Sequence, residues 1–308
     1  MSADAILSRH EADAPHPAPV RAMSSGLAEE ILSRAAEVED PAGRKVPTLS
    51  EEAARAIAAA ARVPLRDVHR QALAAGIWPL RYQRNRDAIS LDGQRALCDA
   101  CVAVVGLGGL GGQAALTLAR LGFGRLLLLD ADRFDETNLN RQALSDTAAL
   151  GRQKSERAAE VVAAVNPAVE VAASAARLGA GNAVDLLRGA AVILDALDNA
   201  PDRLVLEQAA RELGVPLVHA AVAGFEGRLM TIFPGDRGLR LLYPEGAPPP
   251  RGERSEAVLG VPAPAPAVLA TLQAMEAVKL ITGRGRPVRN AMLHLDLEAG
   301  TLERFALS

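Results

Sequence analysis

From residue 101 onward, hydrophobic residues gather in short, nearly uninterrupted runs that are separated by amphipathic stretches. The runs predict five strands, over residues 101–106, 124–130, 169–178, 191–197 and 216–224. The stretches between them predict helices, at about 110–121, 152–164, 181–188 and 201–214. Strands that alternate with helices, and that are apolar on both faces, indicate a doubly wound, Rossmann-like α/β fold with a mainly parallel sheet.

The pattern changes toward the C-terminus. Residues 225–235 and 290–307 alternate between apolar and polar positions, which predicts an antiparallel extension of the sheet. Residues 269–283 predict a further helix. The long segment 235–266 is rich in proline, which disfavours regular structure there.

The N-terminal part shows weaker signals. Residues 1–47 predict a loose, partly helical leader. Two short helices follow: the first begins at a capping box of Thr48 and Glu51, and the second lies between Pro64 and Gly76. The pair is either a helix-turn-helix DNA reader or a helical cap on the main domain, and its many acidic residues favour the cap. We therefore expect a leader and cap over 1–76 and a main domain over 77–308.

Composition narrows the class of protein. The 308 residues are 49% hydrophobic and have a net charge of −3, which gives no sign of a nucleic-acid or membrane-surface partner. No run of 18 apolar residues occurs, and the N-terminus lacks the features of a secretory signal. Two cysteines form no disulfide framework. These features predict a soluble, cytoplasmic protein with no membrane or nucleic-acid partner.

A glycine-rich turn follows the first main-domain strand. Gly106, Gly108, Gly109 and Gly111 allow a tight turn and a close backbone approach to phosphate at a helix N-terminus. Asp130 ends the second strand, where an acid binds ribose hydroxyls. The combination predicts an adenine nucleotide but does not separate ATP from NAD.

Polar and charged residues near the ends of the later strands indicate which nucleotide is bound. Lys154 begins the next helix, and the remaining polar residues follow the second and fourth strands: Asp132, Asn138, Asn140, Arg141, Asp198 and Asn199. Loops after parallel strands share one edge of a sheet, so we expect these residues to converge on one crevice. Two cations and an acid able to bind Mg²⁺ favour a triphosphate. An NAD(P)-dependent oxidoreductase is the alternative.

Several motifs, in order from about Arg81 to the C-terminus, carry a resemblance to a known family. The segments RYQRN, GLGGLG, LDAD, NLNRQ, GRQK, LDALDN and LQAMEAVKL resemble the ThiF/MoeB/HesA family of E1-like, ubiquitin-activating-enzyme-related adenylyltransferases. The resemblance implies a homodimer that uses ATP and Mg²⁺ to adenylate the C-terminal glycine of a ubiquitin-like sulfur carrier (ThiS/MoaD-like) ending in Gly-Gly. It does not name the carrier or its pathway.

The resemblance also implies roles for individual residues. Gly109 and its neighbours would approach the phosphates, and Asp130 the ribose. Asn138, Arg141 and Lys154 would hold the phosphates and the charge that develops on the α-phosphorus. Asp198 would bind Mg²⁺, and Arg84 would reach the ATP of the partner subunit in trans.

The chain departs from the family pattern in its cysteines. Many members carry two CxxC pairs for zinc and a cysteine on the crossover loop, but this chain has no cysteine after Cys101. We therefore predict no zinc and no covalent crossover-loop intermediate. A nucleotide-binding, non-catalytic scaffold is a further alternative.

Four remaining features each have an interpretation without a functional role. Cys98 and Cys101 could form a redox pair, but buried, inert thiols are favoured because neither lies at a helix N-terminus. His219 is expected to be a core histidine, and Trp78 a packing anchor. Arg240, Arg251 and Arg254 on the long loop could meet an acidic carrier or remain solvated.

Overall fold

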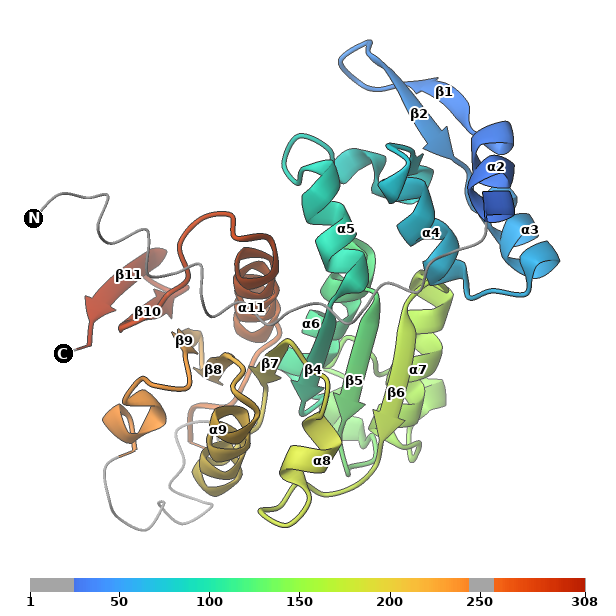
Figure 1. The fold of residues 1–308 in the computed structure, drawn as a ribbon. Coiled ribbons are helices and arrows are strands. Elements are labelled where there is room, and N and C mark those ends of the chain that lie inside the picture. The colour runs from blue at the N-terminus through green and yellow to red at the C-terminus, as the bar shows by residue number, and fades with distance from the viewer. Residues whose placement is uncertain (1–24, 244–257, 308) are drawn as a thin grey trace, which may run out of the picture.

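The computed structural model describes residues 25–243 and 258–307 (Figure 1). Its main element is an eight-stranded sheet of order β11-β10-β9-β8-β7-β4-β5-β6. Five neighbouring strands are parallel, at β4 (Cys101–Val105), β5 (Arg125–Leu129), β6 (Glu170–Ser174), β7 (Val192–Asp195) and β8 (Leu217–Ala223). The doubly wound fold is confirmed, although β6 is shorter than the predicted strand.

The antiparallel extension is confirmed as well. β9 (Glu226–Ile232), β10 (Ala291–Asp296) and β11 (Thr301–Ala306) continue the sheet beyond β8. Each pairs with its neighbour in antiparallel register, as Leu217 with Ile232 and Leu295 with Leu302 show.

Helices cover both faces of the sheet and enclose two apolar cores. The first core includes residues of α6 (Gly109–Leu121), α7 (Lys154–Val165) and α11 (Pro264–Thr282). The second includes α8 (Ala183–Leu187) and α9 (Ala200–Leu213). Along β4, Val102 and Val104 join the first core while Ala103 and Val105 join the second, so both faces are buried. Among the described residues no helix combines the length and apolarity needed to cross a membrane.

Helix α11 begins five residues earlier than the periodicity predicts. Pro264 and Pro266 lie in its first turn, where a missing backbone N–H removes no intrahelical hydrogen bond. Pro264 and Pro266, which the sequence places in the preceding proline-rich segment, therefore start a helix.

The region before residue 80 is more ordered than the sequence predicts. A helix and two strands occupy part of the expected loose leader: α2 (Ser25–Arg34), β1 (Ala36–Glu39) and β2 (Lys45–Leu49). Residues 1–24 lie outside the described residues. Helices α3 (Glu51–Ala61) and α4 (Leu65–Ala74) follow, and then β3 (Trp78–Pro79). Helix α2 agrees with the partly helical leader, but the expectation that 25–47 is loose was wrong. Its few apolar residues, such as the fully buried Ile31, pack against distant helices and leave little periodicity.

The start of α3 also differs from its predicted cap. Thr48 lies in β2, and its hydroxyl donates to the carbonyl of Ala36. Ser50 caps the helix instead, accepting a hydrogen bond from the Ala53 N–H at 3.1 Å. Because β3 pairs with β2, the small sheet crosses the boundary expected between residues 76 and 77.

Helix α4 lies against the main domain. It packs on α5 (Leu91–Asp99), where Arg70 pairs with Asp99 at 2.5 Å, and Arg66 pairs with Glu170 at 3.0 Å. A DNA-reading helix must leave its polar face free for the major groove. The contacts of α4 therefore favour the cap over the DNA reader. Trp78 is buried near Tyr82 in a small apolar cluster, as expected of a packing anchor.

A buried histidine makes the stability of this region sensitive to acid. His69 on α4 is 1% exposed and lies edge-on to Tyr82, and burial lowers its pKa to about 4 despite the opposing charge of Glu51. The unfolded chain keeps a pKa near 6.5 and so binds more protons below that pH. This contribution to stability is present above pH 6.5 and is lost as the pH falls toward 4.

We therefore expect His69→Phe to have a shallower pH dependence of unfolding than the unsubstituted chain. Between pH 7 and 4.5 the unsubstituted chain should lose about 2–3 kcal/mol more than the variant, from about 1.4 kcal/mol per pH unit. Urea unfolding at both pH values measures the difference. Parallel pH profiles of the two chains would contradict the assignment.

Candidate active site

The glycine turn holds three strand ends together. Gly106 follows β4 with a positive φ of 88°, and its N–H donates to the Leu129 carbonyl at the end of β5. A Cβ on Gly106 would lie 2.6 Å from the carbonyl oxygen of Ala196, just beyond β7. A Cβ on Gly111 would lie 1.7 Å from the carbonyl oxygen of Gly106. Both positions therefore require glycine, and the loops after β4, β5 and β7 converge as predicted.

The start of α6 is open to an anion. Gly108 precedes the helix and contributes no side-chain cap, so backbone N–H groups and the positive end of the helix dipole are available there. A Cβ on Gly109 would lie 3.5 Å from Cγ of Arg141. The structure thus brings Arg141 beside the first turn of α6.

Asp130 braces the glycine turn. Its carboxylate accepts a hydrogen bond from the Leu107 N–H at 2.7 Å and another from the Asp132 N–H at 2.8 Å. Burial raises its pKa, while the Lys154 ammonium and the two N–H donors oppose that shift. Each carboxylate oxygen already has one partner and can accept a second hydrogen bond, as ribose binding would require.

Lys154 reaches the same edge from the first residue of α7. It is 6% exposed, and its Nζ lies 3.2 Å from the exposed carboxylate of Asp132. Its backbone N–H also donates to the Asp132 carbonyl. A cation is therefore held within the wall of the crevice, where water screens it weakly.

The turn after β5 orients Arg141. Asn138 is buried at the end of the short 3-10 helix η2 (Glu136–Asn138), and its amide exchanges hydrogen bonds with Asp135. The Arg141 guanidinium donates to the Thr137 carbonyl at 2.8 Å and to the side-chain oxygen of Asn140 at 2.9 Å. Asn138 thus shapes the turn, whereas Arg141 supplies the charge.

Asp198 lies exposed beyond β7. Its Oδ1 accepts a hydrogen bond from the Asn199 amide at 3.2 Å. Asn199 also caps α9, because its Oδ1 accepts from the Asp202 N–H at 2.9 Å. Asn199 therefore has a structural task, and Asp198 keeps oxygens available for a ligand.

Arg84 does not join this crevice. It is exposed on the 3-10 helix η1 (Leu80–Asn85), and the amide of the next residue, Asn85, donates to the carbonyl of Leu121. Leu121 ends α6, whereas the glycine turn lies at the other end of this helix of 13 residues. At 1.5 Å per residue the two ends are about 20 Å apart.

A buried polar cluster near the site was missed from the sequence. Asp195 ends β7 with no exposed surface, and its Oδ2 lies 2.7 Å from Nδ1 of His219. The Arg203 guanidinium approaches the same oxygen at 3.8 Å. Burial lowers the pKa of His219, with Asp195 opposing the shift. His219 is buried as expected. The only sequence signal for its partner Asp195 is that an acidic residue ends the apolar strand β7.

Both cysteines are buried, as predicted. Burial raises the pKa of Cys98 to about 12 and raises that of Cys101 as well. A high thiol pKa opposes formation of the reactive thiolate. These surroundings favour inert thiols over a redox pair.

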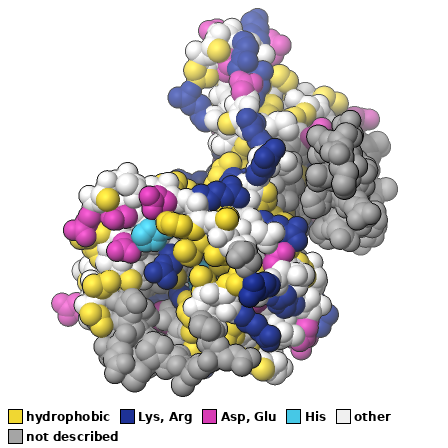
Figure 2. All heavy atoms as spheres, turned by 90° about the vertical axis from the view of Figure 1, so that its left-hand side faces the viewer, with side chains coloured by type: hydrophobic (Ala, Val, Ile, Leu, Met, Phe, Trp, Pro, Cys, Tyr) yellow, Lys and Arg dark blue, Asp and Glu magenta, His cyan; other side chains and the backbone are white. Residues whose placement is uncertain are grey.

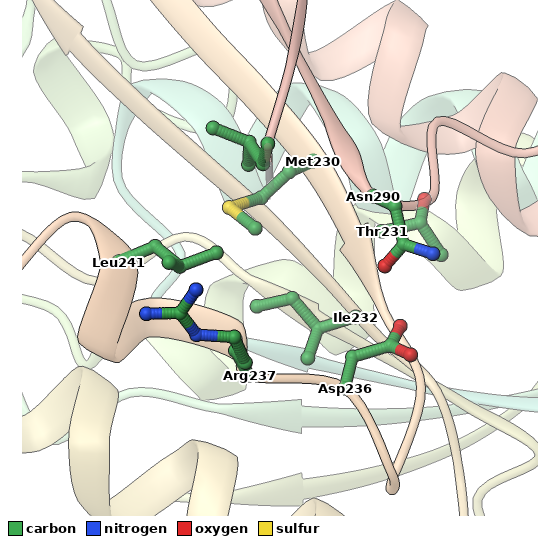
Figure 3. A pocket seen from close by; sticks show the side chains of 9 residues that line it. Met230, Thr231, Ile232, Asp236, Arg237, Leu241 and Asn290 are labelled. Atoms are coloured by element: carbon green, nitrogen blue, oxygen red, sulfur yellow. The ribbon is translucent and has the colours of Figure 1, made fainter.

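Apolar packing surrounds residues 238–243. Leu239 is fully buried in the 3-10 helix η4 (Gly238–Leu241), and Leu242, Tyr243 and Leu307 pack around the same core. A cavity of about 280 Å³ lies beside it, lined in part by Met230, Ile232, Leu241 and Leu307 (Figure 3). In the described part of the chain no three His, Cys, Asp or Glu side chains gather as a metal site.

We expect metal analysis of the purified protein to find far less than one zinc per chain. Chelation with EDTA should leave the melting temperature unchanged, because apolar contacts rather than thiolates join these segments. Stoichiometric zinc, or a fall in melting temperature after chelation, would contradict the prediction.

Curated relatives resemble this chain over most of its length. The SAMP-activating enzyme E1 of Haloferax volcanii is 37% identical over 225 residues, which cover 72% of this chain and 83% of the relative. The sulfur carrier protein ThiS adenylyltransferase of Escherichia coli is 39% identical over 212 residues, covering 68% and 83%. The sulfur carrier protein adenylyltransferase of Thermus thermophilus is 38% identical over 228 residues, covering 71% and 84%.

Solved structures share the fold at lower identity. Escherichia coli MccB with ATP has a TM-score of 0.63 at 20% identity, covering 74% of this chain and 72% of that one. PaaA has a TM-score of 0.61 at 20% identity, covering 93% of this chain and 87% of that one. A family model described as the ThiF family matches residues 82–308. Sequence, site geometry and these matches agree, and the chain belongs to the ThiF family.

Proposed function

We propose that this chain is an ATP-dependent adenylyltransferase that activates the C-terminal glycine carboxylate of a ubiquitin-like sulfur carrier. The observation that carries the proposal is the placement of Arg141 and Lys154 around a glycine turn at the N-terminus of α6. Relatives named as carrier adenylyltransferases and E1 enzymes support the same activity.

The reaction needs charge screening more than proton transfer. A carboxylate oxygen of the carrier attacks the α-phosphorus of ATP, the bond from that phosphorus to the bridging oxygen breaks, and pyrophosphate leaves with the electron pair. No proton moves in this step. Because both reactants are anionic, Arg141, Lys154 and the α6 dipole lower the barrier by holding the phosphates and compensating their charge.

Asp198 fits a role as the protein ligand of Mg²⁺. Its exposed carboxylate has one hydrogen bond to the described residues, at 3.2 Å, and offers the hard oxygen that this ion prefers. Mg²⁺ takes one or two carboxylates and completes its shell with phosphate and water, so one free acid is sufficient. The bound ion would supply further charge neutralisation on the polyphosphate.

Arg84 acts in a neighbouring subunit under this proposal. It lies about 20 Å from the crevice of its own chain, and its guanidinium has no hydrogen bond or ion pair to another described residue. Hydrophobic side chains also gather on the face turned to the viewer in Figure 2. Exposed apolar residues of the described chain include Phe225, Leu302 and Phe305. Both features support a homodimer in which Arg84 reaches the γ-phosphate of the partner's ATP.

No cysteine follows Cys101, so the reaction either stops at the acyl-adenylate or passes it to a separate sulfur donor. Arg251 and Arg254, which could face an acidic carrier, lie outside the described residues. Arg240 is exposed on η4 and remains a candidate for that contact.

An exchange assay tests the function. Radioactive pyrophosphate should enter ATP only when the protein is given a β-grasp carrier that ends in Gly-Gly, and mass spectrometry should detect the carrier adenylate. An NAD(P)-dependent oxidoreductase would bind nicotinamide and exchange no pyrophosphate. A non-catalytic scaffold would bind ATP without exchange, so either result would refute the proposal.

A further inference from the structure

A cluster of buried ionisable side chains adjoins the proposed Mg²⁺ ligand. Asp195, His219 and Arg203 are 0%, 1% and 8% exposed. Burying charge is costly, and a well-packed apolar set of similar volume often stabilises a core equally well. Stability alone therefore does not explain why these ionisable residues are buried here, and their hydrogen bonds indicate a role beyond stability.

The hydrogen bonds of the cluster converge on the residue that precedes Asp198. Asp195 Oδ1 accepts from the N–H of Leu197 at 3.0 Å. The Arg203 guanidinium donates to the carbonyl of the same Leu197 at 2.6 Å. Both polar backbone groups of Leu197 are thus held by buried, charged side chains, and such hydrogen bonds are stronger than neutral ones.

Other contacts keep the two clamping side chains in place. His219 binds the second oxygen of Asp195, and Gln273 donates to the Asp195 carbonyl at 2.8 Å. Arg203 uses its other terminal nitrogen to donate to the Tyr243 hydroxyl at 2.5 Å. The orientation of each charged group is therefore set from a separate part of the fold.

The clamp matters because Asp198 has little support of its own. Its side chain is exposed, and within the described residues its one hydrogen bond comes from the Asn199 amide at 3.2 Å. Asn199 is anchored as the cap of α9, and Leu197 is anchored by the cluster. Hydrogen bonds thus hold the backbone on both sides of Asp198, and this limits the directions that its carboxylate can take.

We propose that Asp195, Arg203 and His219 are positioning residues that clamp the Leu197 backbone and thereby orient Asp198 toward the metal of MgATP. The inference rests on the proposed function of Asp198. Groups that orient a metal ligand usually change metal affinity by about 10–100-fold when they are removed.

Helix α9 offers a matched control for Arg203. Arg211 is also partly buried and pairs with Glu207, but its guanidinium donates to the carbonyls of Pro234 and Asp236, which belong to the loop before η4. Arg211→Met therefore removes a comparable arginine without touching Leu197. Arg203→Lys keeps the charge near Asp195 but loses the planar fork that reaches two acceptors.

The test measures Mn²⁺ binding by electron paramagnetic resonance in the presence of a non-hydrolysable ATP analogue. We expect Arg203→Met and Arg203→Lys to raise the dissociation constant for Mn²⁺ about 10-fold. Arg211→Met should leave it unchanged, even where its melting temperature falls. If Arg203→Met does not fold, the lysine variant decides.

Equal Mn²⁺ affinity in the unsubstituted chain and in a folded Arg203 variant would overturn the clamp, as would an equal loss in Arg211→Met. Failure of the function itself gives a different result. A chain that shows the expected Mn²⁺ pattern but no carrier-dependent exchange would refute the adenylyltransferase and leave the clamp intact.

Discussion

Arg141→Ala and Asp198→Ala are each expected to abolish ATP–pyrophosphate exchange, with a loss of at least about 1,000-fold. Arg141 lies beside Gly109, where the phosphates are expected, and alanine there leaves the charge that develops at the α-phosphorus uncompensated. Asp198→Ala removes the carboxylate proposed to bind Mg²⁺. Initial rates of carrier-dependent exchange at saturating ATP measure both effects.

The control substitution comes from the loop after β5, which also carries Arg141. Arg133→Ala removes an exposed arginine that donates to the Gly151 carbonyl and has no place in the proposed site. It should retain exchange within about two-fold, because surface substitutions rarely change stability by more than about 0.5 kcal/mol. Rates near those of the unsubstituted chain in either active-site variant would refute the assigned roles.

Arg84→Ala should be as damaging, although Arg84 lies far from the crevice of its own chain. An arginine supplied in trans to a phosphoryl group is worth about 10³–10⁵ in rate. The position of Arg84 near the C-terminal end of α6 leaves it this task only in a neighbouring molecule. The variant should still fold, because no described residue depends on its guanidinium.

Mixing two inactive variants tests the trans arrangement directly. In a mixed dimer of Arg84→Ala and Asp198→Ala, one site has its own Asp198 and receives Arg84 from the partner, while the other site lacks both. After random exchange of equal amounts of subunits, about a quarter of all sites should be active. A mixture as inactive as its components, although mixed dimers form, would contradict the trans role.

Much of the fold could be predicted because its signals are local. The apolar runs of β4, β5 and β7 are buried on both faces, and such runs can be recognised in the sequence without knowing which strands pair with them. The N-terminal sheet was missed for the opposite reason. β1 is mostly exposed, and its order comes from pairing with β2.

The candidate site likewise has a part that could be predicted from the sequence and a part that could not. Loops after parallel strands share an edge, so the convergence of the loops after β4, β5 and β7 followed from their order along the chain. The engagement of the Asn138 side chain with Asp135 was not foreseeable, since an asparagine on a loop can shape a turn or bind a ligand.

The amino-acid sequence by itself determined the parallel sheet, the glycine turn and the residue types around it, because periodicity and chain order express these directly. Only the tertiary structure decided that Asp195 meets His219 and Arg203, and that Arg84 lies at the far end of α6. The physical reason is that these arrangements depend on the packing of separate elements. Most buried polar groups pair with groups from other elements, and no local pattern specifies those partners.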